Sequence, residues 1–187
     1  MSVLRDTPQL FSPEEYLATE EDRDIRHEFL NGEVYAMAGT TVDHHRIAGN
    51  IFGALHSHLH GKTCEAFMND MKAHIELAHG EWFYYPDVMV NCDPSGQKKL
   101  YCDTPAVIVE VLSPGTKRID QQEKLLACQA IPALHTYVVV AQNRREVAVF
   151  RRAAGWAKET PPADGALVIP ELEFSRPLDA IYARAGI

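Results

Sequence analysis

Two short apolar segments between Trp82 and Ser113 constrain the fold of this chain more than any other feature. The first reads W-F-Y-Y-P-D-V-M-V and the second reads P-A-V-I-V-E-V-L-S. Both consist largely of aromatic and β-branched residues, which is the composition of buried strands. Each also contains one carboxylate, Asp87 in the first and Glu110 in the second. A carboxylate in a buried strand is unfavourable unless a partner compensates its charge, so both acids are candidate functional residues.

Two such strands lying side by side would direct both acids toward one point at the edge of a sheet. A divalent cation is the natural partner, because Mg²⁺ is usually held by one or two carboxylates and leaves room for substrate phosphates. The alternative is that each acid ends its strand and faces solvent. Glu110 argues against this, since apolar residues precede and follow it. Pro86, which cannot donate a ladder hydrogen bond, indicates that the first strand bends or reaches an edge at Asp87.

Length and charge limit the class of protein. The 187 residues predict one domain over residues 1–187, with a loose arm at residues 1–10. The formal net charge of −8 disfavours a protein that coats nucleic acid non-specifically, because such binding needs many Lys and Arg contacts. It leaves room for an enzyme with a small basic patch around a metal.

The cysteines and the N-terminus indicate the compartment. Four scattered cysteines form no C-x-x-C pair, which predicts reduced buried thiols and disfavours a disulfide framework or a zinc ribbon. The N-terminus lacks the apolar segment of a signal peptide, and no stretch reaches the length of a membrane span. A cytoplasmic protein without a membrane partner is therefore expected.

The order of the predicted elements is helix, strands, helix, strands. This order is typical of an α/β protein with a central mixed sheet flanked by helices, here with an N-terminal helix and hairpin. The signals are a capping box at Ser12 and Glu15, an Asn31-Gly32 hairpin turn, a long helix from Thr41 to His60, and a second helix ending near Ala130.

Polar side chains on the predicted helices have ordinary alternatives. Lys124 is by default a solvated lysine, with Asp120 one turn earlier as its helix partner. His56 and His60 share a face, but Ser57 stands where a zinc protease needs glutamate, so a polar face is the better interpretation.

Two neighbouring histidines and several missing motifs complete the survey. His44 and His45 begin the long helix and either lie near a substrate or serve as capping or surface groups. The sequence contains no G-x-S-x-G elbow, P-loop or G-x-G-x-x-G after a strand. These absences disfavour the common hydrolase, kinase and dinucleotide-binding classes.

Six segments, in this order, resemble the Uma-two family of endonucleases within the PD-(D/E)XK nuclease superfamily. They cover most of the chain between Pro13 and Arg151: H-E-F-L-N-G-E (27–33), H-H-R-I-A-G-N (44–50), N-D-M-K (69–72), Y-P-D-V-M-V (85–90), V-E-V-L-S-P (109–114) and D-Q-Q-E-K (120–124). The resemblance implies a restriction-endonuclease-like core and a metal bound by Asp87 and Glu110. It also makes Glu28 a further ligand or a water-binding group.

One position departs from the superfamily pattern. The superfamily places a lysine two residues after the second acid, where this chain has Leu112. The resemblance implies that the lysine has moved to the following helix, as Lys124. The backbone carbonyl of Val111, beside Glu110, would complete the set of metal ligands.

The reaction expected of such a site is phosphodiester hydrolysis. Mg²⁺, with Mn²⁺ as a substitute, would lower the pKa of bound water and polarise the phosphate. The expected substrate is nucleic acid, and DNA in particular. A homodimer is expected, because a nuclease that cuts both strands commonly works as a two-fold dimer. Two other classes stay open: a nuclease-fold binding module that no longer cleaves, and a metal-dependent hydrolase of a small phosphate ester.

Overall fold

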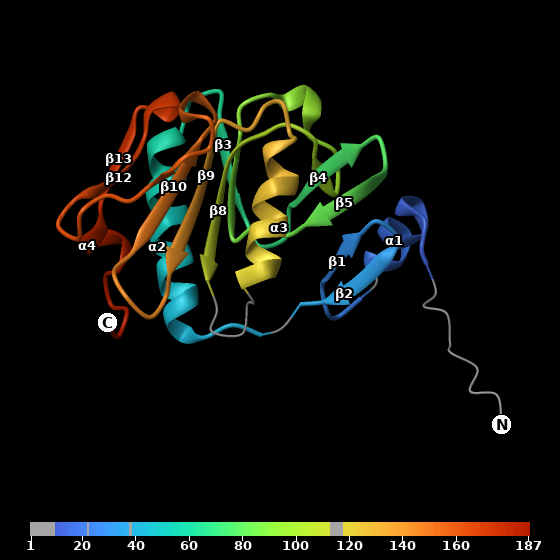
Figure 1. Cartoon of the computed structure of the whole chain (residues 1–187), viewed down its shortest axis with the longest axis horizontal. Helices are drawn as coiled ribbons and strands as arrows, with labels where there is room; N and C mark the ends of the chain where they lie inside the picture. The colour runs from blue at the N-terminus through green and yellow to red at the C-terminus, as the bar shows by residue number, and fades with distance from the viewer. Residues whose placement is uncertain (1–9, 22, 38, 113–117) are drawn as a thin grey trace.

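The protein is described by a computed structural model of residues 10–21, 23–37, 39–112 and 118–187, and the side chains of residues 118–121 are not described (Figure 1). Residues 1–9 of the expected arm lie outside this part, as do Ser113–Lys117 and the side chain of Asp120. Within it, no helix is both long enough and apolar enough to cross a membrane.

The N-terminal elements form where the sequence predicts them. Helix α1 (Pro13–Glu20) begins with a capping box, in which the Ser12 hydroxyl accepts the Glu15 N–H and the Glu15 carboxylate accepts the Ser12 N–H. Strands β1 (His27–Leu30) and β2 (Glu33–Ala36) form an antiparallel hairpin. Its turn residues, Asn31 and Gly32, have φ angles of 50° and 101°, as a tight hairpin turn of this kind requires.

The hairpin belongs to a five-stranded sheet. Strands β4 (Lys72–Leu77), β5 (Gly80–Tyr84) and β7 (Tyr101–Cys102) join it in the order β2-β1-β5-β4-β7. Beside it lies a six-stranded mixed sheet made of β3 (Glu65–Met68), β6 (Val88–Asn91), β8 (Pro105–Leu112), β9 (Thr136–Ala141), β10 (Val147–Arg151) and β11 (Lys158–Glu159) (Figure 1). Its order is β11-β10-β9-β8-β6-β3, and only β8 and β9 run parallel within it.

The C-terminal region is smaller. Strands β12 (Ala166–Ile169) and β13 (Phe174–Pro177) pair in a two-stranded sheet, followed by helix α4 (Leu178–Ile181). In the part of the chain that the structure describes, three single-turn 3₁₀ helices occur in the connections: η1 (Pro94–Gly96), η2 (Arg152–Ala154) and η3 (Pro170–Leu172). The predicted α/β class, with a central mixed sheet flanked by helices and an N-terminal helix and hairpin, is confirmed.

Two helices cover opposite faces of the six-stranded sheet. Helix α2 (Val42–Leu59) buries its apolar stripe against alternate residues of β8, Val107, Val109 and Val111. Ile108 faces the other way and packs with residues of helix α3 (Arg118–Gln129) and the loop after it. This alternation places Glu110 on the α3 side of the sheet. Figure 1 shows both helices against the sheet.

The first apolar segment is two strands, whereas the sequence predicted one. Strand β5 ends at Tyr84 in the five-stranded sheet, and β6 starts at Val88 in the six-stranded sheet. Pro86 lies between them, and its lack of an N–H interrupts the ladder. The chain therefore passes from one sheet to the other immediately before Asp87.

The prediction of four reduced cysteines is wrong for one pair. Cys64 and Cys92 form a disulfide, with their Cα atoms 4.0 Å apart. Glu65 of β3 pairs with Asn91 of β6; Cys64 precedes the first and Cys92 follows the second. Strand pairing therefore brings together two cysteines that are 28 positions apart. That pairing could not be read from the spacing of the cysteines. Cys102 and Cys128 are free and buried, as expected.

Candidate active site

Strand pairing brings Asp87 and Glu110 to the same end of the six-stranded sheet. Strands β6 and β8 are antiparallel neighbours, with Val88 opposite Val109. Asp87 directly precedes Val88, and Glu110 directly follows Val109, so the two acids occupy the next position outward on each chain. The predicted pairing of the two apolar segments is therefore present.

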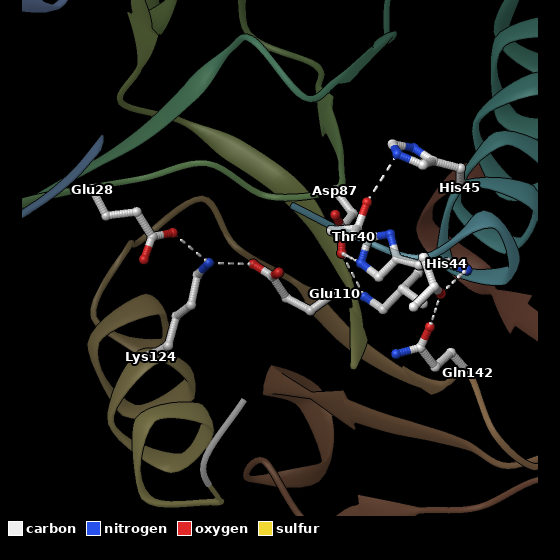
Figure 2. Close-up of polar contacts among 10 residues, drawn as sticks. Glu28, Thr40, His44, His45, Asp87, Glu110, Lys124 and Gln142 are labelled. Atoms are coloured by element: carbon white, nitrogen blue, oxygen red, sulfur yellow. Dashed lines mark hydrogen bonds and ion pairs between the residues drawn. The ribbon is translucent and has the colours of Figure 1, made fainter. Parts of the chain in front are cut away.

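Asp87 is held at the end of the sheet by contacts on two sides. One carboxylate oxygen, Oδ2, accepts the backbone N–H of Val111 at 2.7 Å. The Asp87 side chain thus accepts a backbone hydrogen bond from β8 at a position that β6, which starts at Val88, does not reach. The same oxygen lies 3.3 Å from Nε2 of His44, in the first turn of α2 (Figure 2). Asp87 is consequently fixed between the sheet and α2.

Glu110 points toward α3, where Lys124 lies between two carboxylates (Figure 2). The Lys124 ammonium is 2.9 Å from Glu110 Oε1 and 2.8 Å from Glu28 Oε1. The contact with Glu110 is an ion pair without hydrogen-bond geometry, whereas the contact with Glu28 is also a hydrogen bond. Glu28 Oε1 also accepts the N–H of Tyr85 at 3.2 Å. Glu28, from β1, thus fixes Lys124 from the five-stranded sheet.

The buried charges shift one another's pKa values. Burial raises the pKa of Glu110 to about 8; the nearby charges of Asp87 and Glu28 add to this, and Lys124 opposes it. Burial alone would lower the pKa of Lys124, but the carboxylates of Glu110 and Glu28 outweigh it and hold that pKa well above its usual value. Lys124 therefore remains an ammonium group at neutral pH, while Glu110 ionises more readily when an additional cation is nearby.

The donor atoms suit a magnesium ion. Glu110 Oε1 is buried, and its partner is the Lys124 ammonium, 2.9 Å away. Asp87 is close enough to raise the pKa of Glu110 by its charge. Carboxylate and carbonyl oxygens are the ligands of Mg²⁺ and Mn²⁺, and Mg²⁺ commonly takes one or two carboxylates with water in its other positions. Among the described residues, no group of three or more His, Cys, Asp or Glu side chains forms a ready metal cluster. A cation would thus rest on Asp87, Glu110 and the Val111 carbonyl.

The sequence left the role of His44 open, and the structure places it beside Asp87. His44 is 5% exposed, and its Nδ1 atom has no partner among the described residues. Burial lowers the pKa of His44, but its hydrogen bond to Asp87 and the charge of that residue raise it overall. The hydroxyl of Thr41, the N-cap of α2, donates a hydrogen bond to the side-chain oxygen of Gln142 at 2.5 Å. This bond links the start of α2 to the residue that follows β9. In the sequence, His44 is marked by its position at the start of the helix and by the H-H-R-I-A-G-N segment of the family resemblance.

Four other histidines lie beside or within α2, and three of them, His45, His56 and His60, are exposed. His45 contacts the Thr40 hydroxyl at 2.9 Å (Figure 2). His56 and His60 are exposed, in agreement with a polar helix face. His58 lies 2.8 Å from the carbonyl of Leu172.

Comparison with known proteins assigns the chain to a family. The profile of the Uma2 family, described as "Putative restriction endonuclease", matches residues 13–179. The uncharacterized protein slr1290 of Synechocystis sp. is 32% identical over 174 residues, which is 91% of this chain and 90% of that protein. A second uncharacterized protein of the same organism, sll1609, is 30% identical over 139 residues, or 73% of this chain and 77% of its own length.

A solved structure has the same fold. The crystal structure of a "putative nuclease belonging to DUF820" from Anabaena variabilis superposes with a TM-score of 0.74, covering 91% of this chain and 96% of that one. The two sequences share 14% identity, so this likeness concerns the fold alone. The match over residues 13–179, which is most of the chain, shows that this chain belongs to the Uma2 family, whose description is "Putative restriction endonuclease".

Proposed function

We propose that this protein is a metal-dependent endonuclease that hydrolyses phosphodiester bonds of nucleic acid, with DNA as its substrate. The observation that carries the proposal is the Lys124 ammonium, held between Glu28 and Glu110 at the end of the sheet where Asp87 also lies. A mostly buried lysine fixed by two acids is a preorganised positive charge, which is the kind of group that stabilises charge developing on a phosphate.

Each residue has a defined part in this reaction. Asp87, Glu110 and the Val111 carbonyl would hold Mg²⁺, which supplies a water of lowered pKa and polarises the phosphate when bound. Lys124 would orient the attacking water and stabilise the negative charge on the phosphate oxygens. Glu28 fixes the Lys124 ammonium, and His44 fixes Asp87. Water adds to phosphorus, the bond to the leaving oxygen breaks, and the proton lost by the water ends on that oxygen or in solvent.

A cleavage assay tests the proposal. Supercoiled plasmid, single-stranded DNA and RNA are incubated with the protein in Mg²⁺ or Mn²⁺, beside the Asp87→Ala protein and a metal-free control. We expect metal-dependent nicking or linearisation of the plasmid by the native protein and none by Asp87→Ala. Equal activity of the two proteins would assign the cleavage to a contaminant and refute the proposal.

Two observations favour the other candidate functions. The net charge of −8 suits a hydrolase of a small phosphate ester, which needs fewer basic contacts than a DNA enzyme. Lys124 is paired with two carboxylates, Glu28 and Glu110, which suits a binding module that does not cleave. Hydrolysis of p-nitrophenyl phosphate without cleavage of plasmid would favour the first. Metal-independent DNA binding without cleavage would favour the second.

The assembly and the compartment follow from the same proposal. An endonuclease that cuts both strands of DNA would act as a homodimer in the cytoplasm. The C-terminal hairpin β12–β13 and helix α4 are candidates for the interface. Sedimentation that shows only monomer, at concentrations where plasmid is linearised, would refute the dimer.

A further inference from the structure

A cavity extends from the candidate active site to a second positive charge. Its volume is about 640 Å³, and it begins at Asp87 and His44 and reaches Lys72 and Tyr85. Lys72 is the first residue of β4, which pairs with β5. The cavity therefore connects the end of the six-stranded sheet with the start of a strand in the five-stranded sheet.

Lys72 is a buried cation that has no ionic partner within the described part of the chain. It is 4% exposed, and no carboxylate of the described residues lies within 4.0 Å of its ammonium group. The ammonium lies 4.9 Å from the centre of the Tyr85 ring and 5.9 Å from that of Tyr16. These cation–π contacts compensate part of the cost of burying the charge. Burial nevertheless lowers the pKa of Lys72, so an anion reaching it would be stabilised.

Three of the acids that line the cavity are already engaged. Glu20 accepts the backbone N–H of His27 at 2.6 Å and the Tyr85 hydroxyl at 3.2 Å. Glu21 forms an ion pair at 2.6 Å with Lys99, which does not belong to the cavity lining. Asp70 pairs with Arg26 at the cavity, where the Arg26 side chain is 48% exposed and the Asp70 side chain 75% exposed. Such exposed pairs contribute little to stability, so Arg26 is also available to an incoming anion.

The position of Lys72 suggests which anion it binds. The register that pairs Ala73 with Tyr84 places Lys72 beside Tyr85, and Tyr85 precedes Asp87 by two residues. Lys72, Tyr85 and Asp87 all line the same cavity, so an anion bound at Lys72 would lie beside one held at Asp87.

We propose that Lys72, a buried residue of this cavity's lining, binds the phosphate next to the one that is cleaved. This inference rests on the proposed nuclease function, which it deepens by naming a substrate subsite. Arg26 at the cavity would add a second, exposed contact. The chain would thus bind its substrate with a few charges placed in one cavity, in spite of its acidic net charge.

The test compares Lys72→Met with Lys158→Met. Lys158 lies on β11, is exposed, and lines no part of this cavity. The first measurement is the melting temperature with inorganic phosphate, matched in ionic strength with chloride. We expect phosphate to stabilise the native protein and Lys158→Met by the same amount, and Lys72→Met distinctly less. The second is binding of a labelled single-stranded oligonucleotide in the Asp87→Asn background. Lys72→Met should bind about tenfold more weakly, with a salt slope smaller by about 0.7, as expected for one lost phosphate contact.

Equal phosphate stabilisation and equal salt slopes in all proteins would overturn the subsite and leave Lys72 as a structural residue. If Lys72→Met does not fold, the native protein with ¹³Cε-labelled lysine is titrated with phosphate instead. A saturable shift of the buried lysine signal supports the subsite, and no shift refutes it. Failure of the nuclease proposal is distinguishable, since absence of cleavage on every substrate would leave the phosphate response of Lys72 intact. Conversely, Asp87-dependent cleavage with no effect of Lys72→Met would remove only the subsite.

Discussion

The Lys124 ammonium joins two carboxylates from different sheets, Glu28 on β1 at 2.8 Å and Glu110 on β8 at 2.9 Å. Breaking a buried ion pair by removing one partner is costly, because it leaves charge without compensation. The Lys124→Met protein should therefore lose about 3–5 kcal/mol of unfolding free energy, in addition to any catalytic defect. Urea unfolding measures this loss. Lys158→Met, which removes an exposed pair, is the control and should change stability by about 0–1 kcal/mol. Similar losses in both variants would show that the Lys124 pairs contribute little.

The raised pKa of Glu110 predicts how the unfolding free energy depends on pH when no metal is bound. Its pKa is raised from 4.5 to about 8 on folding, so the folded protein binds more protons than the unfolded chain between these values. Unfolding free energy should therefore fall as pH rises through this window. The pKa of His44 is also raised on folding, so His44 adds to the loss of unfolding free energy as the pH rises above the usual pKa of a histidine. The Glu110→Gln protein should show a flatter profile in thermal melts from pH 5 to 8.

The control for this profile is Glu146→Gln. Arg144 lowers the pKa of Glu146, so the stability it contributes is lost on acidification and not in this window. Its profile above pH 5 should follow that of the native protein. If the unfolding free energy of the native protein rises toward pH 8, folding does not raise the pKa of Glu110.

Metal binding should stabilise the folded protein through Asp87 and Glu110. Mn²⁺ at a hundredfold excess over its dissociation constant should add about 2.7 kcal/mol, because it binds only the folded state. Asp87→Asn and Glu110→Gln should lose most of this gain. The Glu28→Gln protein separates two roles, since a loss of the Mn²⁺ response would make Glu28 a ligand, while a retained response would make it a partner of Lys124. An undiminished response in Glu110→Gln would refute the metal site.

His44 should influence the reaction through Asp87. Residues that orient a ligand commonly change metal affinity or activity by about 10- to 100-fold. We therefore expect His44→Ala to raise the Mn²⁺ concentration needed for half-maximal cleavage by a factor in this range, with maximal rate less affected. His56→Ala, on the exposed part of the same helix, is the control. An unchanged Mn²⁺ requirement in His44→Ala would restrict that residue to packing.

Much of the local structure could be predicted because its signals are local. The capping box of Ser12 and Glu15 and the Asn31-Gly32 turn depend on residues a few positions apart, so the sequence specifies them directly. The pairing of β6, which directly follows Asp87, with β8, which contains Glu110, could be inferred from their composition. The division of the first segment at Pro86 into strands of two sheets could not, because it depends on which partners each half finds.

The contacts of the candidate site required the structure for the same reason. Periodicity made Lys124 an ordinary surface lysine, and only resemblance to a family suggested otherwise. Its two carboxylate partners lie 14 and 96 residues away in sequence. The contact of His44 with Asp87 and the Cys64–Cys92 bond likewise arise from tertiary packing, which no spacing within one segment encodes.

The three residues Tyr85–Asp87, which connect β5 to β6, have a consequence for how this chain tolerates insertions. Connecting segments usually accept changes of length, because they lie at the surface and few contacts depend on them. Here the backbone of Tyr85 binds Glu28 while the side chain of Asp87 binds Val111, and both anchors lie in this short connection. One added residue would displace one anchor or the other. By secondary structure this connection is a loop, yet its length should be as restricted as that of a core strand.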